Sequence, residues 1–283
     1  MNIQLGGVPE HFNFPWHIAE EEGVFDEIDY EFIEFAGGTG AMTQALLNND
    51  INLALLLTEG AIKFIAENQE YKIIKIYVDS PLVWGVHTGK TSKKTPSSTT
   101  PFAISRLGSG SHLMAYVYAQ GKKWASDSLS FLTIQNLEGA RNLFKTEEEA
   151  LFLWEKFTTQ PFVDNGEMQR IDTCPTPWPC FVLVAHQDFI TENQNQLENF
   201  LDGINMCLDL FKSRPEIDKE IAEEYELTIK DAQQWLQETE WNSHMEVSEK
   251  MLNKVIHTLT ELKLIQKKMT PAEIISSLTQ LID

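Results

Sequence analysis

Apolar and polar positions along the first eighty residues predict strands and helices in turn. A strand is predicted at residues 3–8, and residues 30–35 alternate with the period of a strand. Residues 51–57 are continuously apolar, which is typical of a strand buried on both faces. A further strand is predicted at 71–78, and the segments between the strands predict helices over 14–22, 41–48 and 61–68. Alternating strands and helices favour a parallel α/β sheet.

The same alternation resumes after a polar stretch at 88–101, which we expect to be an exposed excursion. Strands are predicted at 102–105, 130–135 and 181–185, a helix at 111–120, and a second helix in the Glu-rich segment 146–158. After Asp188 the pattern is wholly helical. This tail predicts helices over 192–212, 215–225, 228–238, 248–263 and 271–282.

Composition and charge exclude several classes of protein. The chain has 283 residues, of which 42% are hydrophobic and 23% charged, as in an ordinary folded protein rather than a disordered or fibrous one. The formal net charge of −20 repels phosphate backbones, so we expect no nucleic-acid partner. No apolar run approaches the roughly 20 residues of a membrane helix, so we expect no membrane insertion.

The first residues and the cysteines predict a cytoplasmic protein. The N-terminus has no basic segment, long apolar segment or cleavage site of a signal peptide; a periplasmic or lipid-anchored location would require a signal that had been removed. Three cysteines cannot all pair within the chain, so we expect reduced, buried thiols. No His or Cys has a partner at an established ligand spacing, so we predict neither a metal nor a cofactor.

Charge is unevenly distributed. Residues 80–126 contain no Asp or Glu and carry Lys90, Lys93, Lys94, Arg106, Lys122 and Lys123, whereas the first fifty residues carry ten acids and no base. Chance and solubility are one explanation. The other is that two lobes of opposite local charge meet across a cleft.

A Gly- and Ser-rich loop is the strongest candidate for ligand binding. It reads Ser105-Arg106-Leu107-Gly108-Ser109-Gly110-Ser111 and lies between a predicted strand and a predicted helix. Gly108 and Gly110 allow close approach of the backbone, and the helix start offers unpaired N–H groups. With Arg106, Ser109 and Ser111 these groups suit a carboxylate, sulfonate or phosphate. The loop matches neither the Walker nor the dinucleotide pattern, and a tight turn without a ligand is the alternative.

Further candidates follow strands in the first half of the chain. Gly37-Gly38-Thr39-Gly40 opens a helix, and Thr58-Glu59-Gly60 follows a buried strand, at the edge where α/β sheets bind ligands. Glu59 is equally explained as an acid favoured at a helix start. Trp178, within a proline-rich segment, either stacks on a ligand ring or is a buried wedge. No nucleophile–base pair can be assigned, so the catalytic residues are unknown.

These motifs resemble a known family. Gly7-Val8-Pro9-Glu10-His11-Phe12, the Gly37 turn, Leu57-Thr58-Glu59-Gly60 and the Ser105 loop occur in that order. Together they resemble the substrate-binding proteins of the nitrate/sulfonate/taurine class of ABC transporters and the related thiamine-pyrimidine synthase-like proteins. A subgroup without secretion signals is more similar still, also through the segment 175–180.

The resemblance implies an α/β fold of the two-lobe type 2 periplasmic-binding-protein kind with a helical C-terminal tail. Lobe I would comprise residues 1–83 and 187–283, and lobe II residues 84–186, with crossovers near 80–87 and 177–186. The resemblance places a ligand between the lobes, in contact with Glu10, Gly38, Thr39, Thr58 and Glu59 on one side and Arg106, Ser109, Gly110 and Ser111 on the other.

Two functions are consistent with this fold. The first is a protein that closes on a small polar, anion-bearing metabolite as a transport-type receptor or cytoplasmic sensor; an exported form would have an ABC transporter permease as partner. The second is an enzyme on the same fold in thiamine-pyrimidine or menaquinone-precursor synthesis. The resemblance alone supports the second, and Cys180-Phe181 departs from the cysteine run of the pyrimidine-synthase branch.

Overall fold

The apolar runs near the N-terminus form neighbouring strands of a mixed sheet. The computed structural model describes residues 2–90, 92, 95–146 and 148–283. Strand β1 (Asn2–Gly7) pairs in parallel with β2 (Asp29–Glu34) and with β3 (Leu53–Leu57), which is buried from Leu53 to Leu56. The strand order of this sheet is β2-β1-β3-β8-β4-β7-β5-β6, in which β4 is Tyr71–Gly89, β5 Phe102–Ile104, β6 Phe131–Thr133, β7 Leu151–Glu155 and β8 Met168–His186. The α/β class predicted from the sequence is confirmed.

The chain divides into two units that share two long strands. Unit 1 comprises residues 1–80 and 178–283, and unit 2 comprises residues 81–177. Both divisions fall inside strands, β4 (Tyr71–Gly89) and β8 (Met168–His186). The predicted crossovers are therefore continuous strands. The lobe boundaries at 83/84 and 186/187 remain a prediction.

The proline-rich segment is part of strand β8, and its residues are alternately buried and exposed. In β8, Cys174, Thr176 and Trp178 are buried, whereas Pro175 and Pro177 between them are exposed. Thr176 accepts a hydrogen bond from the Leu82 N–H at its hydroxyl (3.0 Å), within unit 2. The two-residue alternation of burial that is typical of a strand thus continues through the prolines. The strand is therefore far longer than the predicted 181–185.

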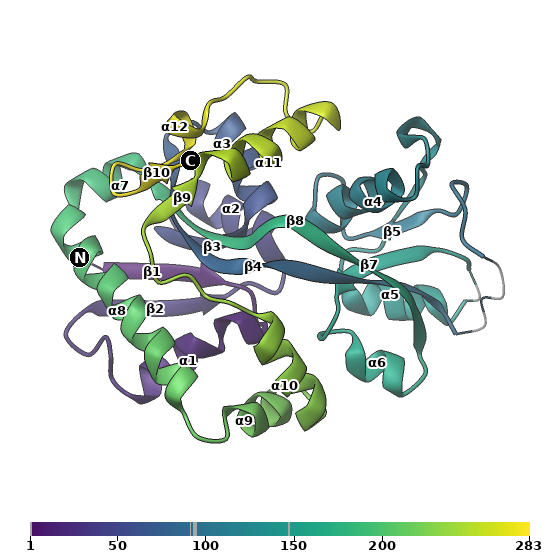
Figure 1. Ribbon diagram of the computed structural model, residues 1–283, viewed down its shortest axis with the longest axis horizontal. Helices are drawn as coiled ribbons and strands as arrows, with labels where there is room; N and C mark the ends of the chain where they lie inside the picture. Colours follow the sequence, from purple (N-terminus) through teal and green to yellow (C-terminus); the bar gives the residue numbers. More distant parts are fainter. Residues whose placement is uncertain (1, 91, 93–94, 147) are drawn as a thin grey trace. The chain divides into compact units, whose positions relative to one another are not determined.

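Unit 1 combines its strands with helices from both of its sequence segments. Helix α1 (Phe14–Glu21) packs against α8 (Gln194–Ser213), α3 (Thr58–Glu67) against α11 (Glu249–Glu261), and α9 (Ile217–Glu224) against α10 (Ile229–Glu238) (Figure 1). Besides β1–β3 and its parts of β4 and β8, its elements are η1 (His11–Asn13), α1 (Phe14–Glu21), α2 (Gly38–Asn48), α3 (Thr58–Glu67), α7 (Gln187–Glu192), α8 (Gln194–Ser213), α9 (Ile217–Glu224), α10 (Ile229–Glu238), β9 (Glu246–Ser248), α11 (Glu249–Glu261), α12 (Pro271–Ile274) and β10 (Gln280–Ile282).

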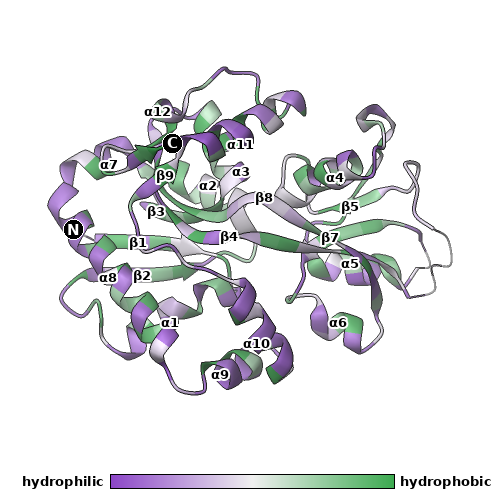
Figure 2. Ribbon diagram, in the orientation of Figure 1, coloured by the Kyte–Doolittle hydropathy of each residue, from purple (hydrophilic) through white to green (hydrophobic). Residues whose placement is uncertain are grey.

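Aromatic side chains fill the core of unit 1. Trp16 is 1% exposed and stacks on Phe25, Phe32 and Phe200, each with ring centroids 6.0 Å apart. Helix α8 buries one face, from Leu197 to Phe211, and hydrophobic and hydrophilic residues alternate along it in Figure 2. The helical periodicity of the tail therefore reflects burial of one helix face, as predicted.

The end of the chain corrects the sequence prediction of a helix over 271–282. Helix α12 stops after one turn, and β10 pairs in parallel with β9. The Ser276 N–H donates to the Ile73 carbonyl (2.8 Å), and the Thr279 hydroxyl donates to the Ile74 carbonyl (2.6 Å). The segment leaves the helix because β4, remote in sequence, supplies hydrogen-bond partners.

Unit 2 has its own sheet segment and core. Strand β5 pairs in parallel with β6 and β7, and β7 pairs antiparallel with β4. Ala103, Phe152 and Met168 lie in a cluster with Ala140 and Phe144. Besides its parts of β4 and β8, the elements are β5 (Phe102–Ile104), α4 (Gly110–Gly121), η2 (Ser126–Ser128), β6 (Phe131–Thr133), α5 (Leu137–Phe144), β7 (Leu151–Glu155) and α6 (Gln160–Asp164).

The Glu-rich segment 146–158 is not the predicted helix. Residue 147 lies outside the described residues, as do Lys93 and Lys94 of the basic stretch. The apolar run from Leu151 forms β7, between β4 and β5. A four-residue apolar run in the centre of a sheet outweighs the helix propensity of the preceding glutamates. The helix of this region is α5 instead, which the sequence analysis missed.

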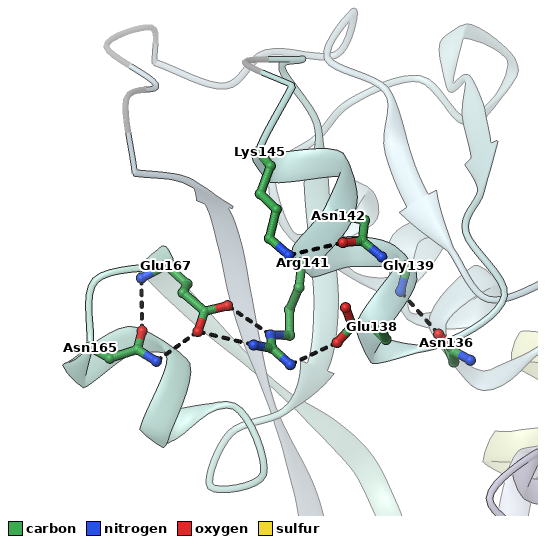
Figure 3. A network of polar contacts seen from close by, with 8 residues as sticks. All are labelled: Asn136, Glu138, Gly139, Arg141, Asn142, Lys145, Asn165 and Glu167. Atoms are coloured by element: carbon green, nitrogen blue, oxygen red, sulfur yellow. Dashed lines mark hydrogen bonds and ion pairs between the residues drawn. The ribbon is translucent and has the colours of Figure 1, made fainter.

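A polar network attaches α5 to the start of β8. Arg141 donates to both carboxylate oxygens of Glu167 (2.7 and 3.1 Å) and to Glu138 (2.7 Å) (Figure 3). Its guanidinium also lies over the Phe162 ring. Asn136 caps α5 by accepting the Gly139 N–H at 3.0 Å. The Arg141 guanidinium is occupied by the two glutamates, and the Asn136 side chain caps the helix, so these contacts fix α5 rather than offering a ligand site.

Candidate functional site

The Gly38 turn of unit 1 is open on one side. Helix α2 begins at Gly38, whose φ of +63° favours glycine. A Cβ at this position would meet no atom within 4 Å. The predicted turn therefore exposes the start of a helix of eleven residues next to empty space.

Thr39 holds the starts of α2 and α3 together. Its hydroxyl accepts the Leu57 N–H at 3.3 Å. A Cβ on Gly60 would lie 2.6 Å from the Thr39 methyl carbon, so glycine is needed for this close approach. Two predicted ligand segments, Gly38–Thr39 and Thr58–Glu59, are therefore brought to one edge of unit 1.

Thr58 is bonded within the protein. It is fully buried, and its hydroxyl donates to the Pro179 carbonyl at 2.6 Å. This bond attaches the start of α3 to β8. The structure thus gives Thr58 a positioning role, and direct contact with a ligand remains a prediction.

Glu59 and Trp178 form a buried pair in unit 1. Each side chain is 2% exposed, and the indole N–H donates to Glu59 Oε2 at 2.8 Å. Glu59 Oε1 has no hydrogen-bond partner among the described residues. Burial raises the pKa of Glu59 to about 7, although the Trp178 bond opposes the rise. Trp178 is the buried wedge considered above; stacking on a ligand ring remains a prediction.

Glu10 lies half-buried at the start of η1, where its carbonyl accepts the Asn13 N–H at 2.9 Å. Tyr225, which follows α9, is close enough that Glu10, Glu34 and Glu224 add to the effect of burial in raising its pKa. The Tyr225 ring also packs on the His11 and Phe14 rings. Sequence reasoning missed Tyr225, because no local pattern connects the tail to Glu10.

Three serines form a buried cluster at the Ser105 loop of unit 2. Ser111 Oγ accepts the Ser105 N–H at 3.0 Å and lies 3.2 and 3.1 Å from the hydroxyls of Ser105 and Ser109. Ser109 caps α4 by accepting the His112 N–H at 3.3 Å. Three hydroxyl protons share two oxygen–oxygen contacts, so one proton remains to be donated elsewhere. Together with the start of α4, this proton suits an anionic group.

Gly108 positions the rest of the loop. Its φ is +79°, and its N–H donates to His112 Nδ1 at 2.9 Å. His112 Nδ1 therefore carries no proton and has its acceptor position filled, so it does not serve as a base for Ser109. Arg106 and Leu107 are exposed, and Leu107 is 71% exposed. A binding loop agrees with this geometry better than a nucleophile–base pair.

A neighbouring turn of unit 2 was missed by the sequence analysis. Beyond β6, the Ile134 N–H donates to the Ile104 carbonyl (2.9 Å), and the Gln135 N–H donates to the Ser105 carbonyl (3.1 Å). Gln135 has a φ of +71° and an exposed side chain. The pairing places Gln135 beside the loop, and the positive φ is not visible in the sequence.

The remaining sequence predictions concern thiols, metals and membranes. Cys174, Cys180 and Cys207 are free and buried, as predicted, and burial raises the pKa of Cys174 to about 11. Among the described residues, no three His, Cys, Asp or Glu side chains gather as a metal site would require. Within the same residues, no helix is both long and apolar enough to cross a membrane.

Comparison with known proteins identifies the fold. Residues 84–174 match the model of the Ca3427-like PBP family. The Candida albicans CA3427 gene product, described as defining a new family with the generic periplasmic-binding-protein fold, is 25% identical with a TM-score of 0.90, over 100% of this chain and 98% of that chain. No curated protein matches the chain.

Two sulfonate-binding proteins are similar in structure. The alkanesulfonate-binding protein SsuA of Xanthomonas axonopodis pv. citri, bound to MOPS, is 12% identical with a TM-score of 0.79, over 97% of each chain. The periplasmic aliphatic sulphonate binding protein SsuA of Escherichia coli is 15% identical with a TM-score of 0.73, over 100% of this chain and 94% of that chain. The chain therefore has the periplasmic-binding-protein fold, and the predicted fold is confirmed.

Proposed function

We propose that this protein binds a small polar metabolite with an anionic group and an N–H donor, as a transport-type receptor or a sensor. The observation that carries the proposal is the pair of glycine turns, each at the carboxyl ends of parallel strands and each opening a helix, at Gly38 in unit 1 and Gly108 in unit 2. Such helix starts bind anions and polar groups in α/β proteins.

The Ser105 loop supports the anionic part of the ligand. The surplus hydroxyl proton of the serine cluster and the guanidinium of Arg106 are both donors, and residues 80–126 contain no acid to oppose an anion. The SsuA proteins, which share the fold, are described as binding sulfonates. Sulfonates are therefore the first class of anion to test.

Unit 1 supports the donor part. Glu59 offers a buried carboxyl oxygen, and Glu10 lies at the same edge of the parallel strands. These carboxyl groups offer a bare anion no favourable partner. We therefore expect simple inorganic anions to bind weakly.

Native mass spectrometry of protein purified from its own host tests the proposal directly. An unchanged metabolite retained at one per chain supports binding. Turnover of that metabolite, or its covalent attachment to a residue such as Lys63, would contradict a pure binding role. Co-purification with a permease would favour the transport receptor over the sensor.

Arg106→Ala should weaken binding of that metabolite by about 1–3 kcal/mol, because a charge-assisted hydrogen bond is lost. Isothermal titration calorimetry measures the change. Lys145→Ala, which removes an exposed base elsewhere in unit 2, is the matched control and should bind normally. Equal affinity of both variants would remove Arg106 from the site.

A further inference from the structure

Glu59 has one carboxyl oxygen that none of the described residues satisfies. Oε2 accepts the Trp178 N–H, but Oε1 is buried without a hydrogen-bond partner among the described residues. No Lys, Arg or His of those residues forms an ion pair with Glu59. Since a buried polar atom without a partner costs about 1–3 kcal/mol, such an atom calls for a specific reason.

Protonation alone does not remove the problem. As a carboxylate, Glu59 has an unpaired acceptor at Oε1. As a carboxylic acid protonated there, it has an unpaired O–H donor at the same atom. Either form needs a partner from outside the described residues.

The surroundings of Glu59 indicate where such a partner would lie. Thr39 ties the start of α2 to Leu57, directly before Thr58 and Glu59, and the space beside Gly38 at this start is open. Thr58 is fixed to Pro179 and does not compete for the partner. The carboxyl group is therefore held in place at the start of α3, which Thr39 ties to the start of α2.

We propose that Glu59 Oε1 anchors a protonated ring nitrogen of the ligand. This inference rests on the proposed binding function and names the donor part of the ligand. The proposal follows from counting hydrogen-bond donors and acceptors. Glu59 has one open acceptor oxygen, and a protonated heteroaromatic ring nitrogen offers one N–H donor, while the faces of its ring are apolar and suit a buried site.

The other common nitrogen cations fit this site less well. A guanidinium or amidinium donates to both oxygens of a carboxylate in a fork, and Trp178 already occupies Oε2. An ammonium brings three donors to one open oxygen and would leave two unpaired in a buried site. The single open acceptor therefore selects against both.

Binding would move one proton. If the free heterocycle is neutral, the Glu59 carboxyl proton passes to the ring nitrogen, and no proton is exchanged with solvent. If the heterocycle arrives protonated, it keeps its proton, and the proton of Glu59 is released to solvent. Below pH 7, where Glu59 is mostly protonated, the second case releases close to one proton per ligand.

The test uses 4-aminopyridine, which is protonated on its ring nitrogen near neutral pH and carries its amino group at the opposite end of the ring, away from Glu59 Oε1. Methylammonium and guanidinium are the comparison probes. Calorimetry at pH 6 in two buffers of different ionisation enthalpy gives the affinity and the number of protons released. We expect 4-aminopyridine to bind best and to release about one proton. Glu59→Gln should lower this affinity about 10- to 100-fold and abolish the release. Glu67→Gln, an exposed change on the same helix, should alter neither.

Several outcomes would overturn the inference. These are equal binding of 4-aminopyridine to Glu59→Gln, equal or tighter binding of methylammonium or guanidinium, and no binding of 4-aminopyridine at all, which would assign Oε1 to a buried water. In each case the proposed function survives if native mass spectrometry still finds a retained metabolite. Absence of any retained metabolite would instead count against the proposed function.

Discussion

Each unit contains a buried glutamate and a tryptophan near the point where a long strand enters it, but the two pairs are bonded differently. In unit 1, Trp178 donates to Glu59 at 2.8 Å. In unit 2, Trp84 lies opposite Glu155 in the β4–β7 pairing, yet its indole N–H has no partner among the described residues. Glu155 Oε2 instead accepts the N–H and the hydroxyl of Thr158, at 2.6 and 2.9 Å.

The comparison separates two uses of a buried acid. Burial raises the pKa of both glutamates to about 7, so neither burial nor pKa distinguishes them. Glu155 is bonded to a residue three positions along the chain and stabilises a turn. Glu59 is bonded across two elements distant in sequence and keeps an open oxygen. The open atom, rather than the shifted pKa, therefore identifies the candidate binding residue.

The largest expected effect is a loss of folding stability as the pH rises, and both glutamates contribute to it. Because each folded-state pKa lies above the unfolded value near 4.5, the stabilisation is complete below pH 4.5 and is lost as the pH rises through about 7. Each shift corresponds to about 3 kcal/mol. Unfolding by denaturant from pH 4.5 to 8 should show this loss, and Glu59→Gln and Glu155→Gln should each remove a part of it.

Glu67→Gln is the control for that pH series, because Glu67 is exposed on α3. This change should leave the slope of the free energy of unfolding against pH unaltered. If either buried glutamate were replaced without any change of slope, that glutamate would have an ordinary pKa. The similarity between the two units would then be lost.

The two tryptophans should respond differently to the same truncation. Trp178→Phe removes the indole donor to Glu59 Oε2, whereas Trp84→Phe removes an N–H that has no partner among the described residues. At pH 8 we expect Trp178→Phe to be less stable than Trp84→Phe by about 1–3 kcal/mol. Chemical denaturation measures both. Equal losses would show that ring volume, not the hydrogen bond, matters at Trp178.

The smallest effects compare helix caps inside and outside the candidate site. Ser109 caps α4 in the Ser105 loop, and Thr228 caps α10 by accepting the Asp231 N–H at 3.1 Å. Either change to alanine should cost about 1 kcal/mol of stability. Only Ser109→Ala should also weaken binding of the native metabolite, as measured by calorimetry. Weaker binding by Thr228→Ala would place ligand contacts beyond the predicted loop.

Part of the candidate site was predictable because it lies in strand–helix turns. Glycines at 38 and 108 mark positive φ angles, and Ser109 marks a helix start; these signals are local. Tyr225 and Gln135 were missed because their places beside Glu10 and Ser105 depend on the approach of segments distant in sequence. The bond between Trp178 and Glu59 was likewise invisible, although both residues were candidates.

Local sequence patterns were enough to predict the α/β alternation, the buried strand β3, the Thr228 cap of α10 and the glycine turns, since each depends on neighbours a few residues apart. Tertiary structure decided that residues 151–155 form a strand and that residues 280–282 pair with β9, because pairing partners overrode local propensity. It also decided which buried acid keeps an open oxygen. Hydrogen bonds between distant elements settle that question, and no local pattern encodes them.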